Sequence, residues 1–296
     1  NWAKLTGGQS GIHAISRFPT DGLKTRIAGS VDFLGQPEST AAHSEQMADL
    51  AAEEAIAQSG LGKPGDFPGP LFLAVPPIEM EWPHRLEVGA HSGSNDQVTY
   101  ADLLRASSQF PAYHGRFLFG SVADHIAEKF GTRGSPISLS TACASGTSAI
   151  QLGVEAIRRG ETDAALCIGT DGSVNPEAVI RFSLLSALST SNDNPQKAAR
   201  PFSKNRDGFV MGEGAGALVL ESYDAAKARG AKILGVVEGC GEKTDAFHRT
   251  RSSPDGKPII ACIKNALEDA GLTPDDIDYV NAHGTSTPEN DKMEYL

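Results

Sequence analysis

The chain has 296 residues, of which 40% are hydrophobic and 21% are charged, and this composition is typical of a globular protein. The formal net charge is −11 and no block is rich in lysine or arginine, which argues against a nucleic-acid-binding surface. No apolar run is long enough to cross a bilayer, and residues 1–10 lack the apolar core of a signal peptide. We therefore expect a cytoplasmic protein that binds neither nucleic acid nor membrane.

From residue 40 onward, helical and strand-like patterns alternate. Helices are predicted at 43–60, 145–160, 176–189 and 257–272, and strands at 70–77, 135–140, 163–171, 216–222, 231–239 and 276–283. Residues 79–115 are polar and irregular, and we expect them to run over the surface with one helix at 100–109. Strands that alternate with helices indicate an α/β fold with a mostly parallel sheet covered on both faces. Ligands bind such sheets where strands end and loops begin.

The cysteines and histidines do not form a metal-binding pattern. The four cysteines, Cys143, Cys167, Cys240 and Cys262, lack CxxC spacing, and the eight histidines include neither HxH nor HExxH. In a chain of this size without an export signal, we expect reduced thiols and no metal site.

Cys143 is the first candidate for chemistry, in the sequence STACASG at residues 140–146. It lies between a predicted strand and a predicted helix, where the unpaired N–H groups and dipole of the helix favour a thiolate. A sharp turn before the helix would also expose the sulfur, as in a nucleophile elbow. The small neighbours Ala142, Ala144 and Gly146 would let a substrate approach. The alternative interpretation is a buried structural cysteine, and the motif alone does not decide between the two.

His283 is the second candidate, at the end of a predicted strand and followed by Gly284, Thr285, Ser286 and Thr287. By itself it would be read as a core histidine, but together with a strand-end cysteine it indicates a functional site. The sequence MGEGAGA at 211–217 resembles a phosphate-binding loop, yet it precedes a strand and does not open a helix, so the dinucleotide interpretation fails. Phe209 before it would line an apolar channel or pack in the core.

Three motifs in this order, STACASG, ARPFSKNRDGFVMGEGAGALVLE and VNAHGTSTPENDKME, give the chain a family resemblance. It resembles the β-ketoacyl-[acyl-carrier-protein] synthases of the elongating, FabF/FabB-like type, from residues 8–12 to its end. The resemblance implies a thiolase-like αβαβα fold, with the nucleophile half at 1–222 and the start of the histidine half at 223–296. It also implies a homodimer, no cofactor and a cytoplasmic acyltransferase of fatty-acid biosynthesis.

The resemblance further assigns roles to individual residues. Cys143 matches the nucleophile that takes an acyl chain from acyl carrier protein, and His283 matches the first of two histidines that support decarboxylation of the malonyl thioester. The resulting carbanion would attack the acyl thioester in a Claisen condensation. Thr285 and Thr287 match residues that bind the phosphopantetheine arm. Two further residues also match the family, Phe209 as an aromatic beside the site and Glu294 as an acid that pairs with a lysine further along.

Several positions depart from the family pattern. The second histidine, the lysine and the loop that completes the oxyanion hole have no counterpart before Leu296, and the chain begins after the family's first strand. We therefore expect a fragment, apparently incomplete at both ends, that does not condense by itself. The helix at 38–50, near the usual carrier-docking face, has no Lys or Arg, so docking would use Arg200 or Arg206. We expect a specialised carrier or an unusual acyl length.

Two other functions stay open. A cysteine thioester hydrolase would need a general base and an orienting group, and Asn281 near His283 is the available candidate. A non-catalytic chain-length-factor-like partner usually lacks the nucleophile, so the presence of Cys143 weighs against it. The residues leave the acyl length, the preferred carrier and the pathway open.

Overall fold

The computed structural model describes residues 2–63, 65–93, 98–248 and 251–296. The chain divides into two compact units, each built from separated segments. The nucleophile unit comprises Val31–Ser173 and Glu213–Lys232, and the histidine unit comprises Asn1–Ser30, Val174–Gly212 and Ile233–Leu296. The predicted division of the sequence at 222 and 223 stays a prediction.

A four-stranded sheet forms the centre of the nucleophile unit. Its strands are β3 (Leu71–Ala74), β4 (Ile137–Leu139), β5 (Ala164–Asp171) and β6 (Gly214–Glu221), in the order β4-β3-β5-β6. The first three are parallel, whereas β6 runs antiparallel to β5 over its whole length. The four strands predicted between residues 70 and 222 are confirmed. Because β6 begins at Gly214, the glycine motif opens a strand, as its position in the sequence indicated.

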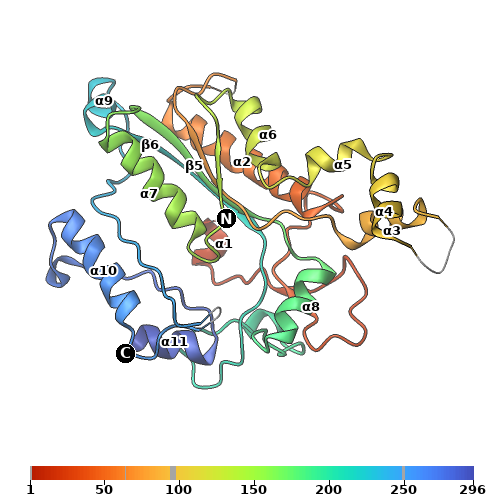
Figure 1. Cartoon of the computed structure of the whole chain (residues 1–296). Helices are drawn as coiled ribbons and strands as arrows, with labels where there is room; N and C mark the ends of the chain where they lie inside the picture. The colour runs from red at the N-terminus through yellow and green to blue at the C-terminus, as the bar shows by residue number, and fades with distance from the viewer. Residues whose placement is uncertain (1, 64, 94–97, 249–250) are drawn as a thin grey trace. The chain divides into compact units, whose positions relative to one another are not determined.

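Helices cover both faces of this sheet (Figure 1). On one face lies α7 (Ser145–Arg158), and on the other lie α2 (Thr40–Ser59) and α6 (Ser121–Phe130). The strand β3 shows how the sequence fills both layers. Leu71 and Leu73 pack with α2 and α6, while Phe72 and Ala74 pack with α7, because successive side chains of a strand point to opposite faces. The sequence of a strand that is buried on both faces therefore does not alternate between apolar and polar residues.

The helix α7 contacts the sheet closely at one glycine. A Cβ added at Gly153 would lie 2.5 Å from Sγ of Cys167 on β5. The absence of a side chain at 153 therefore sets how near α7 comes to the sheet. Since α7 also follows Cys143, this contact fixes the helix whose amino terminus meets the candidate nucleophile.

Residues 79–116 are more ordered than the sequence predicted. The predicted helix at 100–109 is confirmed as α4 (Tyr100–Ser107). The helices α3 (Trp82–Ala90) and α5 (Pro111–Arg116) also form, so the prediction of a single helix in this segment was wrong. Contacts between rings connect these short helices: the ring of Tyr113 lies 5.2 Å from His84 and 5.3 Å from Phe110. Tertiary packing stabilises helices that are too short to persist alone. Residues 94–97 of this predicted excursion lie outside the described part of the chain.

The histidine unit contains the strands β1 (His13–Ala14) and β2 (Ile27–Ala28) and several helices. These are α1 (Trp2–Thr6), α8 (Pro176–Leu184), α10 (Lys257–Ala270) and α11 (Pro288–Tyr295), with 3₁₀ turns at Pro195–Lys197 and Pro274–Asp276. The helix α9 (Tyr223–Ala228) belongs to the nucleophile unit. The predicted helices at 176–189 and 257–272 are confirmed, the first ending early at Leu184.

The strands predicted at 231–239 and 276–283 are wrong. All residues of these two segments are described, and none of them forms a strand. Tyr279 and Val280 are 80% and 74% exposed. A β-prone pattern indicates only that a segment is able to join a sheet. A strand also needs a neighbouring backbone to pair with. That neighbour is missing among the described residues of this chain.

Candidate active site

Cys143 lies in a tight turn between β4 and α7. The residue before it, Ala142, has a φ of 54°, in the left-handed region that residues other than glycine rarely adopt. Hydrogen bonds within the turn hold this conformation, because Ser145 Oγ accepts from Thr141 N at 2.8 Å and donates to the Ala142 carbonyl at 2.6 Å. The helix begins at Ser145 with Ala144 as its N-cap residue. Cys143 therefore comes immediately before the cap of a 14-residue helix, as the sequence predicted.

The environment of Cys143 differs from that of Cys167. The side chain of Cys143 is exposed, whereas Cys167 is 2% exposed inside the sheet. Burial raises the pKa of Cys167 to about 12, so its thiol stays protonated near neutral pH. Exposure and a position at a helix amino terminus are the conditions under which a thiolate can form and react. Of these two cysteines, Cys143 is the one suited to be a nucleophile.

His283 lies in the loop that leads into α11, and its backbone is held by Glu294. The Glu294 carboxylate accepts the N–H of His283 at 2.6 Å and the N–H of Gly284 at 2.7 Å, and it also accepts from Asn290 Nδ2 at 2.9 Å. The side chain of His283 is exposed. The family resemblance implies a lysine partner for Glu294, and that pairing stays a prediction. In this structure Glu294 orients the histidine loop from its own helix.

Asp291 anchors the same loop through hydrogen bonds and an ion pair. Its side chain is fully buried, accepts the backbone N–H groups of Phe202 at 2.8 Å and Ser286 at 3.1 Å, and pairs with Arg206 Nε at 3.2 Å. Arg206 also donates to the carbonyls of Thr287 and Pro288. The left-handed Ser286, with a φ of 69°, is thereby fixed between the two segments. These contacts join residues 200–209 to residues 283–291 within the histidine unit.

Asp291 and the anchoring role of Arg206 were not predicted from the sequence. A signal was present, because Thr287 and Pro288 form a helix start and an acidic residue in the first turn is typical of one. A helix does start there in the structure: Thr287 is the N-cap of α11, and its Oγ1 accepts from Asn290 N at 3.3 Å. Which backbone groups Asp291 would meet was not encoded locally, since Phe202 lies 89 residues away.

The two threonines of the loop contact each other. Thr285 Oγ1 and Thr287 Oγ1 are 2.8 Å apart, and both residues are half-buried. Phe209 follows Gly208, whose N–H donates to the Ser286 carbonyl at 3.2 Å, but its ring meets Phe182 edge-on at 5.3 Å and packs against a cluster that includes Val179 and Met211. These contacts favour the core-packing interpretation of Phe209, and its role beside a substrate stays a prediction.

The two arginines predicted for carrier docking differ in exposure. The side chain of Arg206 is 18% exposed and is occupied by the loop contacts described above. The side chain of Arg200 is 29% exposed and reaches Asp207 at 3.4 Å and Ser191 Oγ at 3.0 Å. Arg200 therefore has the more accessible charge. Docking through either residue stays a prediction.

Most of the candidate residues thus lie close together in one region of the histidine unit. These residues are His283, Thr285, Thr287, Glu294, Arg200 and Arg206. Cys143 belongs to the nucleophile unit. Within residues 2–63, 65–93, 98–248 and 251–296, no group of three His, Cys, Asp or Glu side chains could hold a metal ion. The helices of that same described part include none that combines the length and the apolar character needed to cross a bilayer.

Comparisons with known proteins identify the family of the chain. Residues 1–226 match the family described as "Beta-ketoacyl synthase, N-terminal domain", and residues 234–296 match "Beta-ketoacyl synthase, C-terminal domain". The chain is 36% identical over 304 residues to 3-oxoacyl-[acyl-carrier-protein] synthase 2 of Vibrio cholerae. It is 35% identical over 308 residues to the tetracenomycin polyketide synthase ketoacyl synthase alpha subunit of Streptomyces glaucescens. Each alignment covers 99% of this chain and 70% of the relative.

A solved structure extends the likeness to three dimensions. It contains a type II polyketide synthase acyl-carrier protein in complex with its ketosynthase bound to the hexaketide, and it matches with a TM-score of 0.81 and 31% identity. The match covers 99% of this chain and 71% of that one. The chain therefore belongs to the β-ketoacyl synthase family and has the thiolase-like fold of ketosynthases. Its class is that of the 3-oxoacyl-carrier synthases, acyltransferases that elongate fatty-acid or polyketide chains.

Proposed function

We propose that Cys143 accepts an acyl chain from an acyl carrier protein. The thiolate attacks the carbonyl carbon of the carrier thioester, a new carbon–sulfur bond forms at Cys143, and the phosphopantetheine sulfur leaves and takes up a proton. The observation that carries this proposal is the exposed Cys143 sulfur immediately before the cap of α7. The helix dipole and the open N–H groups of the first turn stabilise the thiolate and the oxyanion that develops during attack.

The second half-reaction needs His283 and the second histidine that the family resemblance implies, so we expect it only in a protein that contains both. The His283 N–H donates to the thioester oxygen of a malonyl carrier and stabilises the enolate that remains when carbon dioxide leaves. The enolate carbon attacks the acyl carbonyl on Cys143, the carbon–sulfur bond breaks, and the Cys143 thiolate is regenerated. The product is a 3-oxoacyl thioester that is two carbons longer. The hydrogen bonds from the His283 and Gly284 amides to Glu294 support this role, because they fix the backbone from which the imidazole projects.

The proposed partners follow from this chemistry. The carrier brings the phosphopantetheine arm, which Thr285 and Thr287 bind, and the enzyme needs no cofactor of its own. Arg200 is the preferred docking residue for the acidic carrier, since Arg206 is occupied by the histidine loop. The location of the protein in the cytoplasm stays a prediction.

A homodimer is the proposed assembly. The strand β4 lies at the edge of the sheet, and among the described residues β3 is its ladder partner. Ile137 on β4 is 45% exposed. An edge strand with an apolar side chain can pair with a second copy of the chain. Analytical ultracentrifugation of the wild type and of Ile137→Lys tests this, because the charged residue should shift the equilibrium toward monomer.

Intact-mass spectrometry after exposure to an acyl-carrier thioester tests the acylation step. We expect the mass of one acyl group to be added, and the adduct to be lost in Cys143→Ala but retained in Cys262→Ala. The same sample separates the other functions. Steady thioester cleavage without malonyl consumption would indicate a hydrolase, and no adduct at all would indicate a binding partner such as a chain-length factor.

A further inference from the structure

Ser30 and His13, in the histidine unit, form a hydrogen-bonded pair that the proposed function does not use. Ser30 Oγ lies 3.0 Å from Nε2 of His13, and the Gly11 carbonyl oxygen lies 2.9 Å from Nδ1 of the same ring. All three residues belong to the first segment of the unit. A nucleophile within hydrogen-bond reach of a base, with that base oriented by a third group, is the arrangement that activates a serine.

The Gly11 carbonyl decides which nitrogen of the His13 ring carries the hydrogen. A carbonyl oxygen only accepts hydrogen bonds, so Nδ1 is the donor of this contact. In the neutral ring Nε2 is then unprotonated and accepts from the Ser30 hydroxyl. The imidazole is therefore held in the tautomer that takes a proton from a serine, as an aspartate holds it in Ser–His–Asp hydrolases.

The strands β1 and β2 bring the two side chains together. They pair antiparallel with His13 opposite Ala28, so Ser30 follows the end of β2 beside the residues that lead into β1. The two segments stay close beyond the paired residues, since a Cβ added at Gly29 would lie 3.9 Å from the Gly11 carbonyl oxygen. The pairing of the strands therefore sets the distance between the hydroxyl and the ring.

The backbone on both sides of Ser30 is held by hydrogen bonds. The Gly29 N–H donates to the Met211 carbonyl at 2.8 Å, and the Val31 N–H donates to the Glu213 carboxylate at 2.8 Å. A side chain whose backbone is fixed on both sides loses little entropy when it is aligned with a reacting group. The serine is thus positioned before any substrate arrives.

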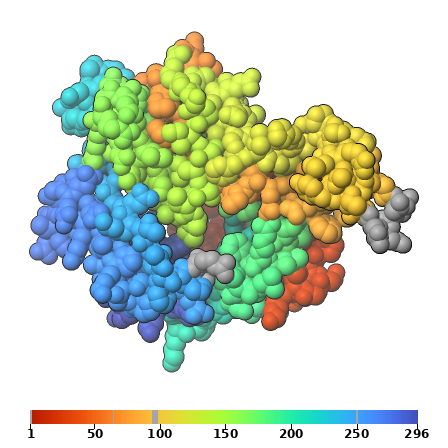
Figure 2. Space-filling view, in the orientation of Figure 1, coloured from red at the N-terminus to blue at the C-terminus, as the bar shows by residue number. Residues whose placement is uncertain are grey.

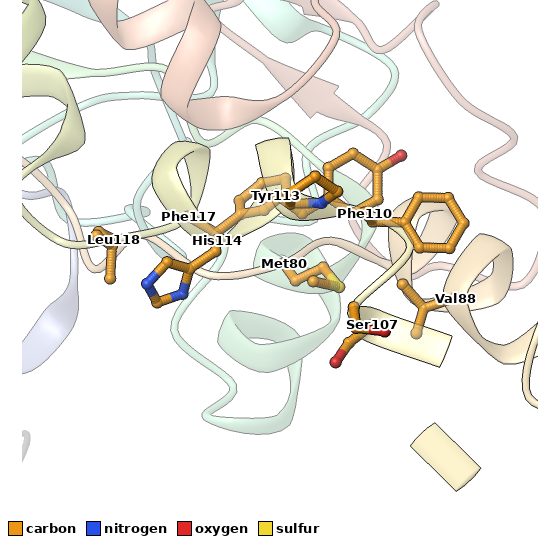
Figure 3. A pocket seen from close by; sticks show the side chains of 10 residues that line it. Met80, Val88, Ser107, Phe110, Tyr113, His114, Phe117 and Leu118 are labelled. Atoms are coloured by element: carbon orange, nitrogen blue, oxygen red, sulfur yellow. The ribbon is translucent and has the colours of Figure 1, made fainter. Parts of the chain in front are cut away.

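The hollow at α4 and α5 shows the more common use of a serine hydroxyl. Ser107 and His114 both line this hollow, at separate places in Figure 3. The Ser107 hydroxyl donates to the Leu104 carbonyl of its own helix at 2.8 Å, a local contact typical of serine. Ser30 differs because its partner is a base, 17 residues away in the sequence.

The pair is accessible to small molecules. Ser30 and His13 are half-buried, and Gly11 and Ala14 beside them are exposed. Figure 2 shows part of the N-terminal segment, in red, at the surface of the molecule. A half-buried hydroxyl is reached more readily by a small acyl group than by a folded polypeptide. A carboxylic ester suits such a pair, because its alkoxide leaves more easily than the amine of an amide.

We propose that Ser30 and His13 form a second site, which hydrolyses small acyl esters. Ser30 Oγ attacks the ester carbonyl carbon, and the hydroxyl proton moves to His13 Nε2. The carbon–oxygen bond to the alcohol breaks, and the alcohol leaves with the proton from His13. Water then attacks the acyl group on Ser30 and gives a proton to Nε2. The carboxylic acid is released, and that proton returns to Ser30 Oγ.

Labelling with an alkyl fluorophosphonate tests the nucleophile in Cys143→Ala protein. The Ser30 oxygen displaces fluoride from phosphorus, and His13 takes the hydroxyl proton. We expect peptide mass spectrometry to find the phosphonyl group on Ser30. The labelling rate should fall about 100-fold in His13→Gln, because the amide keeps a hydrogen bond but does not take the proton. Ser16→Ala, which removes an exposed serine close to β1, is the matched control and should leave labelling of Ser30 unchanged.

Hydrolysis of p-nitrophenyl acetate measures turnover. We expect Cys143→Ala protein to release p-nitrophenol about 10-fold faster than the same protein with Ser30→Ala added. Imidazole added to His13→Ala protein should restore part of the fluorophosphonate labelling, since it fits the space of the missing ring. A purely structural hydrogen bond would change the unfolding temperature and would respond to neither test. Circular dichroism confirms that the variants fold.

Each outcome decides the proposal. Equal labelling of Ser30 in the parent and in His13→Gln, without rescue by imidazole in His13→Ala, would overturn the pair. Labelling of Ser16 in preference to Ser30 would do the same. Labelling at Ser30 with equal ester hydrolysis in Ser30→Ala would overturn the esterase activity. All of these measurements are made in Cys143→Ala protein, so a failure of the proposed acylation at Cys143 would leave them unchanged.

Discussion

The carboxylate of Glu294 accepts the backbone N–H groups of both His283 and Gly284, at 2.6 and 2.7 Å. A single side chain on α11 thus fixes the peptide on each side of the candidate catalytic histidine. Hydrogen bonds to a charged acceptor contribute more than neutral ones, so this contact is well suited to hold an exposed imidazole in one orientation.

Replacing Glu294 with Gln should loosen this loop without removing its side-chain volume. The neutral amide has one acceptor oxygen and cannot serve both N–H groups as strongly. We expect amide hydrogen exchange at His283 and Gly284 to accelerate about 10- to 100-fold. Mass spectrometry of the peptide that covers residues 280–288 measures the change. Glu289→Gln, on the same helix but 73% exposed, should leave exchange unchanged. Equal exchange in both variants would remove Glu294 from this role.

The cysteines should differ in their reaction with iodoacetamide. At pH 8 we expect Cys143 to be alkylated first and Cys167 to stay unmodified in the folded protein, because burial raises the pKa of Cys167 to about 12. Unfolding in urea should abolish the protection. Peptide mass spectrometry over time gives the order of modification, and alkylation of Cys167 before Cys143 would contradict the assignment of the nucleophile.

Asp291→Asn should destabilise the protein through its buried pair with Arg206. The variant removes the charge partner of the half-buried Arg206 guanidinium and weakens the acceptor of two backbone N–H groups, a loss that costs about 1–3 kcal/mol in the free energy of unfolding. Urea denaturation measures it. Arg206→Gln should be similarly destabilising, whereas Lys204→Gln, at an exposed neighbouring position, should have little effect. A docking role of Arg206 without a structural role would instead weaken carrier binding at unchanged stability.

The two glycines of α7 should respond oppositely to alanine. At Gly153 a Cβ meets Cys167 Sγ at 2.5 Å and Leu220 Cδ1 at 3.0 Å, so overpacking should cost about 1–3 kcal/mol. At Gly146 nothing lies within 4 Å of the added atom, and the higher helix propensity of alanine should stabilise by up to about 1 kcal/mol. Thermal unfolding distinguishes the two. A gain in stability at Gly153 would mean that the helix moves away from the sheet without cost.

Asp207 should make the stability of the protein depend on acid pH. Burial acts to raise the pKa of Asp207, but hydrogen bonds from Ser189, Thr190 and Ser191 and the charge of Arg200 outweigh it and lower the pKa. The unfolded carboxyl has a pKa of about 3.9, so the contribution is present above that pH and is lost as the pH falls further. Asp207→Asn should therefore destabilise most at pH 7 and least near pH 2. Asp193→Asn, at an exposed position two residues after Ser191, is the control for unfolding at both pH values.

The sequence by itself determined the elements whose signal is local. The strands of the nucleophile unit and the helix after Cys143 follow from apolar runs and small residues that are neighbours in the chain. The position of Cys143 before a helix is also local, because a strand, a turn and a helix in that order fix it. The same patterns, at 231–239 and 276–283, predicted strands that do not form, since pairing depends on another segment.

Tertiary structure alone decided which distant groups meet. The burial of Asp291 against the backbone of Phe202, and the ring contacts of Tyr113 that order α3 and α5, join residues whose proximity no local pattern encodes. The physical reason is that a buried polar group can form a hydrogen bond, and an aromatic ring can pack, with any suitable group that the fold places next to it. The sequence identifies the polar and aromatic side chains that need partners, and only the folded structure brings those partners to them.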